Sequence, residues 1–250
     1  MSALLENTFE GPQLDIYEFR QMTPVSSYAV IIAVGSLEKK KLIYRTNVFA
    51  ENKYIKKCFK TFRSHIIESM LQIAESLCGP YAWGRYDVCV LPPSIAYFEI
   101  ECPCVAFISP ALLGGDSTSF TSLARNISQS WAGNLVTCSN YEHLWLNKSF
   151  NIFISRKIEN KILIDEDMKP SLERKGLNDV NNMVEKKFEN DDLLKCLIPN
   201  LTSLSLHEAT LYVPYETVCM LLGYLENTLG PSVLEPFLKS YFSKKIAKID

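Results

Sequence analysis

An apolar stripe along residues 53–78 constrains the fold of this chain more than any other feature. Its members recur every three or four residues, and they are Ile55, Phe59, Phe62, Ile66, Met70, Ile73 and Leu77. Apolar residues at this spacing occupy one face of a helix, which must be buried against other elements. The sequence therefore predicts one long helix over residues 53–78 that packs on a globular core.

Other segments predict strands and further helices around this helix. Residues 27–36 contain a β-branched run that ends in glycine, a pattern typical of a strand. Further strands are expected near 86–91, 97–101 and 104–109. Ser117 or Ser119 is expected to cap a helix that runs to about Leu135. The remaining helices are expected near 140–157, 214–229 and 231–245. Residues 158–200 are highly charged, and a loop or a weak helix is expected there.

The composition is that of an ordinary soluble globular chain. Hydrophobic residues make up 47% of the sequence, charged residues 22%, and the formal net charge is −2. This balance gives no reason to expect nucleic acid or an anionic membrane as a partner. The chain has no apolar run long enough for a transmembrane helix. Residues 1–21 are acidic and lack the apolar core of a signal peptide, so a cytoplasmic location is expected.

Eight cysteines raise the question of a metal site or a disulfide framework. No pair has the C-x-x-C spacing, and the intervals are irregular. Without a secretory signal, reduced thiols are expected, most of them small buried apolar groups. Cys102-Pro103-Cys104 is the one close pair, and a thiol-based metal or redox site there remains an alternative.

Five short sequence words in fixed order point to a family. They are Gly79–Asp87 (GPYAWGRYD), Leu91–Ser94 (LPPS), Ser130–Thr137 (SWAGNLVT), Trp145–Asn147 (WLN) and Val213–Glu216 (VPYE). Together they resemble the M1 family of zinc aminopeptidases, in its leukotriene A4 hydrolase and aminopeptidase B branch. The resemblance runs from about residue 17 to about residue 243, and residues 159–205 match poorly.

The resemblance implies an α+β fold. Residues 51–250 would form a thermolysin-like (gluzincin) peptidase domain, with a small mixed sheet and mostly helices. Residues 1–50 would be a remnant of the family's N-terminal β domain, and the family's C-terminal helical domain would be absent.

The same resemblance locates the family's zinc site. M1 peptidases carry H-E-x-x-H on a helix, in which the two His bind zinc and the Glu is the general base. The aligned residues here are Arg125, Asn126 and Gln129. The third ligand in the family is a Glu that follows Trp-Leu-Asn. Here Lys148 follows Trp145–Asn147, and 18 residues separate it from Gln129, as in the family.

These replacements remove the chemistry of a catalytic zinc site. Zinc needs ligands with available lone pairs, which Arg125 cannot offer and Lys148 offers only after losing a proton. Gln129 supplies a weak amide oxygen, and the two cations repel a divalent metal. Asn126 cannot accept a proton from water as a carboxylate does. The ancestral zinc is therefore expected to be lost, with no cofactor in its place.

Two further family positions concern substrate. Glu101 aligns with the glutamate that binds the substrate's amino group, but Phe98 and Glu99 occupy neighbouring positions of that segment, where the family lets a backbone approach closely. Tyr215 aligns with the tyrosine that stabilises the oxyanion. An alternative is that Tyr215 simply packs at a helix start after Pro214.

The sequence thus predicts a catalytically inactive M1 relative, a pseudoenzyme, whose remaining activity would be peptide or protein binding. One alternative is a metal-free enzyme or anion-binding pocket built on Arg125 and Lys148, with Glu101 and Tyr215 nearby. The simpler reading of those two cations is that they neutralise older acidic groups or turn to solvent. The other alternative is a structural subunit that partners an intact relative through residues 27–36.

Overall fold

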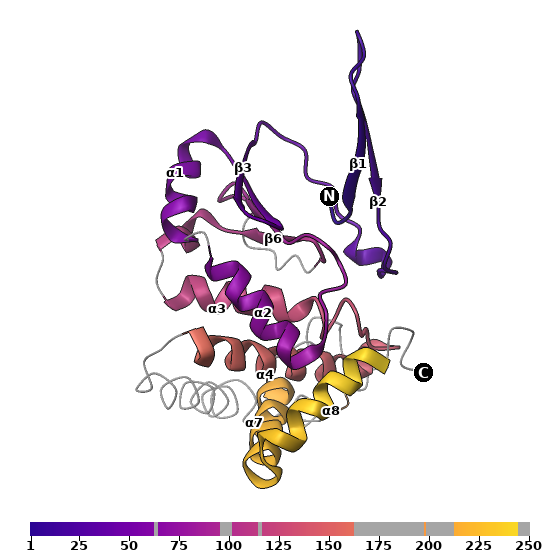
Figure 1. Ribbon diagram of the computed structural model, residues 1–250, viewed down its shortest axis with the longest axis vertical. Helices are drawn as coiled ribbons and strands as arrows, with labels where there is room; N and C mark the ends of the chain where they lie inside the picture. Colours follow the sequence, from indigo (N-terminus) through magenta and orange to yellow (C-terminus); the bar gives the residue numbers. More distant parts are fainter. Residues whose placement is uncertain (63–64, 96–101, 115–116, 163–197, 199–212, 245–250) are drawn as a thin grey trace, which may run out of the picture. The chain divides into compact units, whose positions relative to one another are not determined.

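The computed structural model describes residues 1–62, 65–95, 102–114, 117–162, 198 and 213–244 (Figure 1). The chain divides into two compact units. The first comprises Met1–Gln72 with Pro80–Ser130, and the second comprises Ile73–Gly79 with Trp131–Asp250. Within the described ranges, no helix is both long and apolar enough to cross a bilayer.

A four-stranded sheet organises the first unit. Its strands, in the order β3-β4-β5-β6, are β3 (Glu38–Ile43), β4 (Thr46–Ala50), β5 (Asp87–Val90) and β6 (Val105–Ile108). The β3–β4 hairpin is antiparallel, whereas β4–β5 and β5–β6 are parallel. β6 is buried along its whole length, as expected of a parallel strand covered on both faces. Cys89 and Phe107, paired across β5 and β6, belong to one apolar cluster.

This architecture confirms the predicted α+β fold. The strands expected near 86–91 and 104–109 correspond to β5 and β6, and the strand expected at 97–101 lies outside the described residues. β4 ends at residue 50 and β5 lies beyond it, and the two strands pair in one sheet. The predicted domain boundary at that residue stays a prediction.

A second, two-stranded sheet in the same unit was not predicted. β1 (Leu4–Phe9) and β2 (Ile16–Arg20) form an antiparallel hairpin, drawn in indigo in Figure 1. Nearly all its side chains are exposed. Strands that are exposed on both faces lack the alternation of apolar and polar residues that sequence patterns rely on.

The strand predicted for residues 27–36 is wrong. The structure has a 3-10 turn, η1 (Ser27–Ala29), followed by irregular chain. Ile31 exchanges two hydrogen bonds with Ser2, from Ser2 N to Ile31 O (3.0 Å) and from Ile31 N to Ser2 Oγ (2.9 Å). β-branched residues favour a strand only where a partner strand continues the ladder, and here the pairing stops after one residue.

The single helix predicted for residues 53–78 is also wrong, because it is broken in two. α1 (Asn52–Thr61) ends at Phe62, and α2 (Ile66–Cys78) follows. At the end of α1, the Thr61 hydroxyl donates to the Leu113 carbonyl (2.8 Å), which ties the helix end to the 3-10 segment η2 (Pro110–Gly114). The apolar period continues through the break, so the pattern alone could not reveal it.

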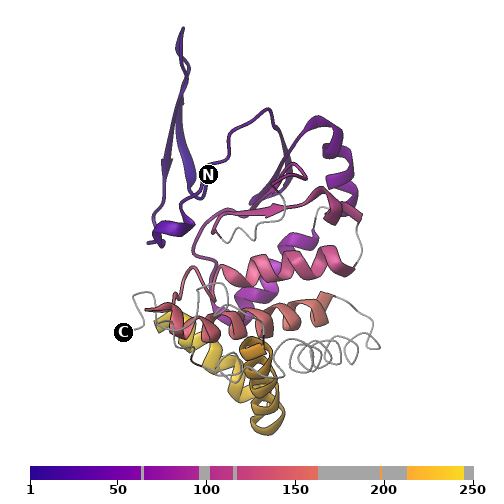
Figure 2. The same ribbon diagram turned by 180° about the vertical axis from the view of Figure 1, so that it is seen from behind.

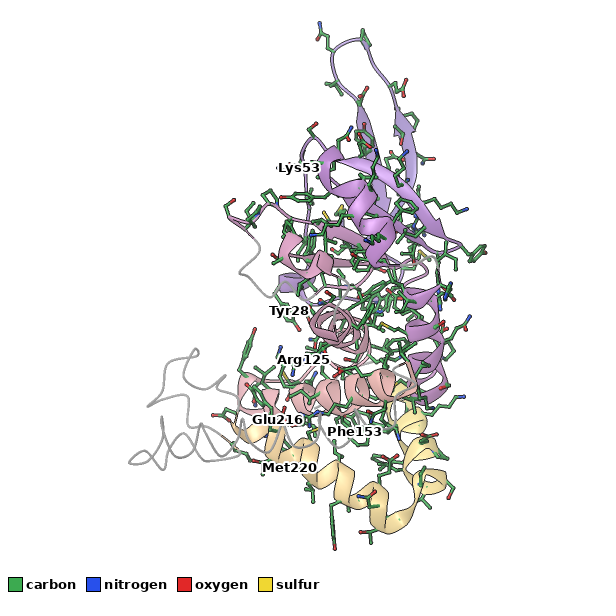
Figure 3. The ribbon with its side chains drawn as sticks, turned by 90° about the vertical axis from the view of Figure 1, so that its left-hand side faces the viewer. Tyr28, Lys53, Arg125, Phe153, Glu216 and Met220 are labelled. Carbon is green, nitrogen blue, oxygen red and sulfur yellow. The ribbon has the colours of Figure 1, made fainter. Side chains whose placement is uncertain are left out.

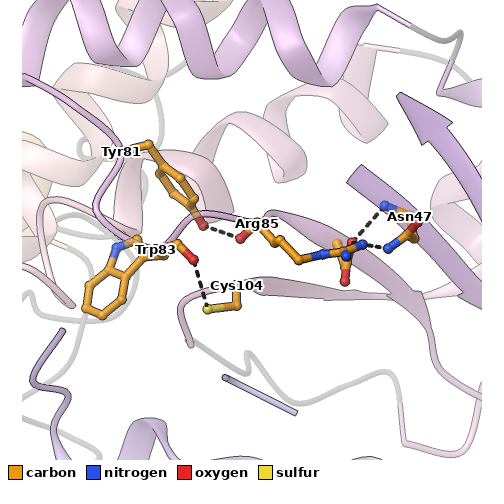
Figure 4. A network of polar contacts seen from close by, with 6 residues as sticks. Asn47, Tyr81, Trp83, Arg85 and Cys104 are labelled. Atoms are coloured by element: carbon orange, nitrogen blue, oxygen red, sulfur yellow. Dashed lines mark hydrogen bonds and ion pairs between the residues drawn. The ribbon is translucent and has the colours of Figure 1, made fainter. Parts of the chain in front are cut away.

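The segment between α2 and β5 carries the first family word and is held by polar contacts (Figure 4). The Tyr81 hydroxyl donates to the Arg85 carbonyl (3.0 Å), and the Cys104 thiol donates to the Trp83 carbonyl (3.8 Å). The Asp87 carboxylate accepts hydrogen bonds from the Asn47 backbone (2.7 Å) and side chain (3.0 Å). Burial raises the pKa of Asp87, and the Asn47 hydrogen bond opposes this shift.

Helices dominate the described part of the second unit. They are α4 (Leu144–Ile162), preceded by the 3-10 turn η3 (Tyr141–His143), α7 (Val213–Leu229) and α8 (Pro231–Lys244). The three helices match those predicted near 140–157, 214–229 and 231–245. Most of residues 158–200, predicted to be a loop or a weak helix, lie outside the described residues. α4 packs against α7 (Figure 2). Phe150 of α4 stacks on Tyr241 of α8.

Gly230, between α7 and α8, provides a test of backbone conformation. It has a φ of +85°, in the left-handed region that an L side chain adopts only under strain. We expect Gly230→Ala to lower the free energy of unfolding by about 1 kcal/mol. Gly223→Ala is the matched control, because Gly223 lies inside α7 with open space around its missing Cβ. This control is expected to raise stability by about 0.5–1 kcal/mol, as measured by urea unfolding. Equal effects of the two substitutions would contradict the left-handed backbone conformation of Gly230.

Candidate functional site

Helix α3 (Ser117–Gln129) carries the first three zinc-site positions. Its start is fixed by the Ser119 hydroxyl, which donates to the Leu112 carbonyl. Leu123, Ala124 and Ile127 are buried, and α3 contacts η2 and β6 within the first unit. The predicted helix ran to about Leu135, but α3 ends at Gln129 because the chain turns sharply after Ser130.

The side chains at the zinc-site positions are an arginine, an asparagine and a glutamine. Arg125 and Gln129 are four residues apart on α3 and therefore share one face, as the two ligands of H-E-x-x-H would. Arg125, labelled in Figure 3, is half-buried, and Gln129 is only 5% exposed. Asn126 donates its side-chain amide to the Ser122 carbonyl (3.0 Å), one turn back along the helix. Its amide nitrogen is thus engaged with backbone.

The turn that follows α3 belongs to the second unit and is held by its own hydrogen bonds. Val136 N donates to the Trp131 carbonyl (3.0 Å), and the buried indole of Trp131 donates to the Gly79 carbonyl (3.1 Å). The side-chain amide of Asn147 donates to the Val136 carbonyl (2.6 Å). The words Ser130–Thr137 and Trp145–Asn147 therefore meet through a backbone carbonyl, and this structural role does not require a metal.

Lys148, at the third ligand position, is half-buried on α4 directly after Asn147. Its charge acts on Cys138, a half-buried thiol in the same unit. Burial raises the pKa of Cys138, while a backbone hydrogen bond and the Lys148 ammonium lower it in part. The ligand position of the family therefore holds a cation close to a thiol.

Tyr215 lies in the first turn of α7 and is 6% exposed. Its burial at the helix start is compatible with both alternatives, so its role at the oxyanion-stabilising position stays a prediction. Its neighbour Glu216 is fully buried and pairs with Arg156 of α4, with Arg156 Nη2 2.8 Å from Oε1 and 2.7 Å from Oε2. The other guanidinium nitrogen of Arg156 donates to the Cys219 sulfur (3.2 Å). Figure 3 labels Glu216 on this helix pair.

The cluster of Arg156, Glu216 and Cys219 was missed in the sequence. Glu216 stands in the word Val213–Glu216, which offered one signal. Its partner lies 60 residues away in the sequence. Pattern reading within one helix gives no indication of a contact between two helices so far apart in the chain.

Glu101, the predicted amine-binding residue, lies outside the described residues, as do Phe98 and Glu99. The adjacent Cys102 and Cys104 are buried and not in a disulfide bond. Burial raises the pKa of Cys102 to about 12 and that of Cys104 to about 11. Cys104 also adopts a φ of 71°, which is uncommon for a residue with a side chain. None of the seven described cysteines lies in a disulfide bond, and the eighth, Cys196, lies outside the described residues.

These positions do not offer the chemistry of a zinc site. An arginine, a primary amide and an ammonium stand where three lone-pair ligands are needed. Across the described ranges, no group of three or more His, Cys, Asp or Glu side chains is arranged to hold a metal ion. Arg125, Asn126 and Gln129 come from the first unit, and Lys148 and Tyr215 from the second.

Comparison with known families gives one match over most of the chain. The Peptidase family M1 domain matches residues 63–248. Leukotriene A-4 hydrolase of Xenopus laevis is 38% identical over 227 residues, which are 90% of this chain and 37% of the relative. Leucine aminopeptidase 2 of Candida albicans is 32% identical over 240 residues, which are 91% of this chain and 38% of the relative.

Solved structures agree with the sequence relatives. The native yeast LTA4 hydrolase superposes with a TM-score of 0.86 at 30% identity, over 97% of this chain and 38% of that chain. An M1 zinc metallopeptidase from Deinococcus radiodurans superposes with a TM-score of 0.69 at 17% identity, over 97% of this chain and 52% of that chain, which shows the fold alone. The chain thus spans little more than a third of the length of the sequence relatives that it matches.

The buried pair of Arg156 and Glu216 predicts a large stability effect. Glu216→Gln keeps the shape but leaves the guanidinium without its counter-charge, so the free energy of unfolding should fall by about 3–5 kcal/mol. Glu6→Gln is the control, because Glu6 pairs with Arg20 at 3.6 Å on the exposed hairpin and should change stability by less than about 1 kcal/mol. Urea unfolding measures both. A loss for Glu216→Gln as small as that of the control would contradict the role of the pair.

The proximity of Lys148 to Cys138 predicts a change in thiol reactivity. Lys148→Gln removes the nearby positive charge, so the pKa of Cys138 should rise and its alkylation by iodoacetamide at pH 8 should slow about twofold or more. The rate is measured by mass spectrometry of the Cys138 peptide. Lys157→Gln serves as the control, because the Lys157 ammonium pairs with Glu226 and Glu235 instead. An unchanged or faster rate in Lys148→Gln would show that the ammonium does not act on the thiol.

Proposed function

Because this chain belongs to peptidase family M1, we propose that it is a pseudoenzyme of that family, which keeps the fold but does not hydrolyse peptides through a zinc-bound water. The observation that carries the proposal is the set of side chains at the zinc-site positions. Arg125, Gln129 and Lys148 stand at the three ligand positions and Asn126 at the general-base position. Each of the four replacements alone would impair the site.

The electrostatics of the site support the same proposal. Two of the family's three ligand positions carry the positively charged residues Arg125 and Lys148, and a positive charge repels a divalent cation. Gln129 is almost fully buried, so the one weak donor of the set is not open to solvent. Tyr215 could stabilise an oxyanion only if another group generated the nucleophile, and Asn126 cannot do so. The residues present do not fit zinc.

Loss of hydrolysis leaves binding as the activity that the fold could serve. The scaffold words keep their structural contacts, such as the Trp131 indole on the Gly79 carbonyl. A peptide or protein partner is therefore proposed, with neither nucleic acid nor membrane as a ligand of the former active site. The described cysteines, none of them in a disulfide bond, support a reducing compartment such as the cytoplasm.

Metal binding tests this proposal directly. The purified chain, dialysed against zinc and then against metal-free buffer, should retain well under one zinc per chain by elemental mass spectrometry. The variant Arg125→His, Asn126→Glu, Gln129→His and Lys148→Glu restores the family's donors and should retain more zinc than the parent. A variant with only Arg125→His and Gln129→His is the matched control, because Lys148 still repels the metal.

The parent chain gives the decisive result. About one tightly held zinc per parent chain, or aminopeptidase turnover that a chelator abolishes, would overturn the pseudoenzyme proposal. Circular dichroism of each variant confirms that it has folded before its metal content is compared.

A further inference from the structure

Positive charge is concentrated in one short stretch of this chain. Residues 38–60 contain seven lysines and one arginine against two glutamates, although the whole chain has a net charge of −2. The stretch forms β3, β4 and α1, which all lie in the first unit. The net charge of the chain therefore conceals a strongly basic surface on one part of the fold.

The lysines of α1 form a single exposed stripe. Lys53, Lys56, Lys57 and Lys60 are spaced at i, i+3, i+4 and i+7, opposite the buried face of the helix. Lys53, labelled in Figure 3, pairs with Glu51 at 2.5 Å and lies over the ring of Tyr54. Lys56, Lys57 and Lys60 form no ion pair with another residue in the part of the chain that the structure describes. Their ammonium groups are available to a partner.

A second group of lysines lies on the neighbouring strand. Lys39, Lys40 and Lys41 are exposed on β3, which is at the edge of the sheet and pairs only with β4 among the described strands. Because side chains alternate along a strand, Lys39 and Lys41 lie on one face of the sheet and Lys40 on the other. α1 packs against both β3 and β4, so the helix that carries the lysine stripe lies next to the strand that carries the second group.

An edge strand offers more than charge. Its outward N–H and C=O groups can pair with an extended polypeptide, which then adds a strand to the sheet. Lysines on both faces of β3 would lie opposite alternate side chains of such a strand, and opposite charges at these positions stabilise the pair. A nucleic acid or a lipid headgroup could use the lysines but not the backbone edge. A second copy of β3 would place lysines opposite lysines and is disfavoured.

From this combination we propose that β3 and the lysine stripe of α1 form a docking surface for an acidic, extended segment of another polypeptide. The segment pairs with the open edge of β3, and its carboxylates contact Lys39, Lys40 and Lys41. Lys56, Lys57 and Lys60 attract the flanking acidic residues. This inference does not depend on the loss of zinc chemistry.

The probe is a fluorescein-labelled peptide of about eight residues with alternating Glu and Val, the length of an ordinary strand. Fluorescence anisotropy with the full chain should show saturable binding that weakens at about 0.5 M salt, because salt screens exposed charges. The variant Lys56→Glu, Lys57→Glu and Lys60→Glu should bind roughly tenfold more weakly or worse, a change of about 1.4 kcal/mol. The control Lys161→Glu, Lys239→Glu and Lys244→Glu makes the same charge change at exposed lysines of the second unit and should bind like the parent.

Two further measurements separate strand addition from simple attraction between charges. A peptide N-methylated at alternate residues keeps its charges but cannot pair with β3, and it should not bind. Hydrogen exchange should show new protection of residues 38–43 when the parent peptide is bound. Equal binding of the methylated peptide, or no protection of β3, would overturn the proposal. Single-stranded RNA or phosphatidylserine vesicles that bind through the same lysines when the peptide does not would overturn it in favour of another polyanion.

Discussion

The second unit depends on the turn at Trp131–Val136, which is tied to both α2 and α4 by hydrogen bonds to backbone carbonyls. The Trp131 indole is 1% exposed and donates to Gly79 at the end of α2, and the Asn147 amide donates to Val136 from α4. A buried donor left without its acceptor costs about 1–3 kcal/mol, so neither side chain can be exchanged freely. The sequence words that point to the family are therefore structural, and they persist where the zinc ligands do not.

The sequence predicted those parts of the fold that a local pattern determines. β5, β6, α4, α7 and α8 were all anticipated, because their periodicity and their boundary residues, such as Gly230, act over a few positions. The strand at 27–36 and the unbroken helix at 53–78 failed for the opposite reason. A strand needs a partner strand, and the break after α1 coincides with a hydrogen bond from Thr61 to Leu113, 52 residues away. The candidate site shows the same difference between local and long-range information. The resemblance located Arg125 and Lys148 from short sequence words, whereas the pairing of Arg156 with Glu216 depends on a contact between two helices that no local pattern reveals.

Net charge was a poor guide to the surface of this chain. A total of −2 gave no reason to expect nucleic acid or an anionic membrane as a partner, yet residues 38–60 carry seven lysines and one arginine against two glutamates. Lysines on an edge strand normally prevent the edge strands of two copies of a protein from pairing with each other. The same charges select for a partner strand of opposite sign, because repulsion of like strands and attraction of acidic strands have one physical origin.

The side chains at the family's zinc-ligand and general-base positions suit the packing and solvation of α3 and α4, and none of them is suited to catalysis by a zinc-bound water. Asn126 donates to the carbonyl of its own helix at Ser122, which a short amide can reach and which satisfies one of its two donor hydrogens. Gln129 is buried, and an uncharged side chain costs much less to desolvate there than a charged one. Lys148 is half-buried, and its aliphatic stem can cover apolar surface while its ammonium remains charged. Under the proposed loss of zinc, no metal selects these residues, and each position can follow the solvation and hydrogen bonding of its own helix. In this proposal, the helix environments of Asn126, Gln129 and Lys148 account for these side chains without a metal.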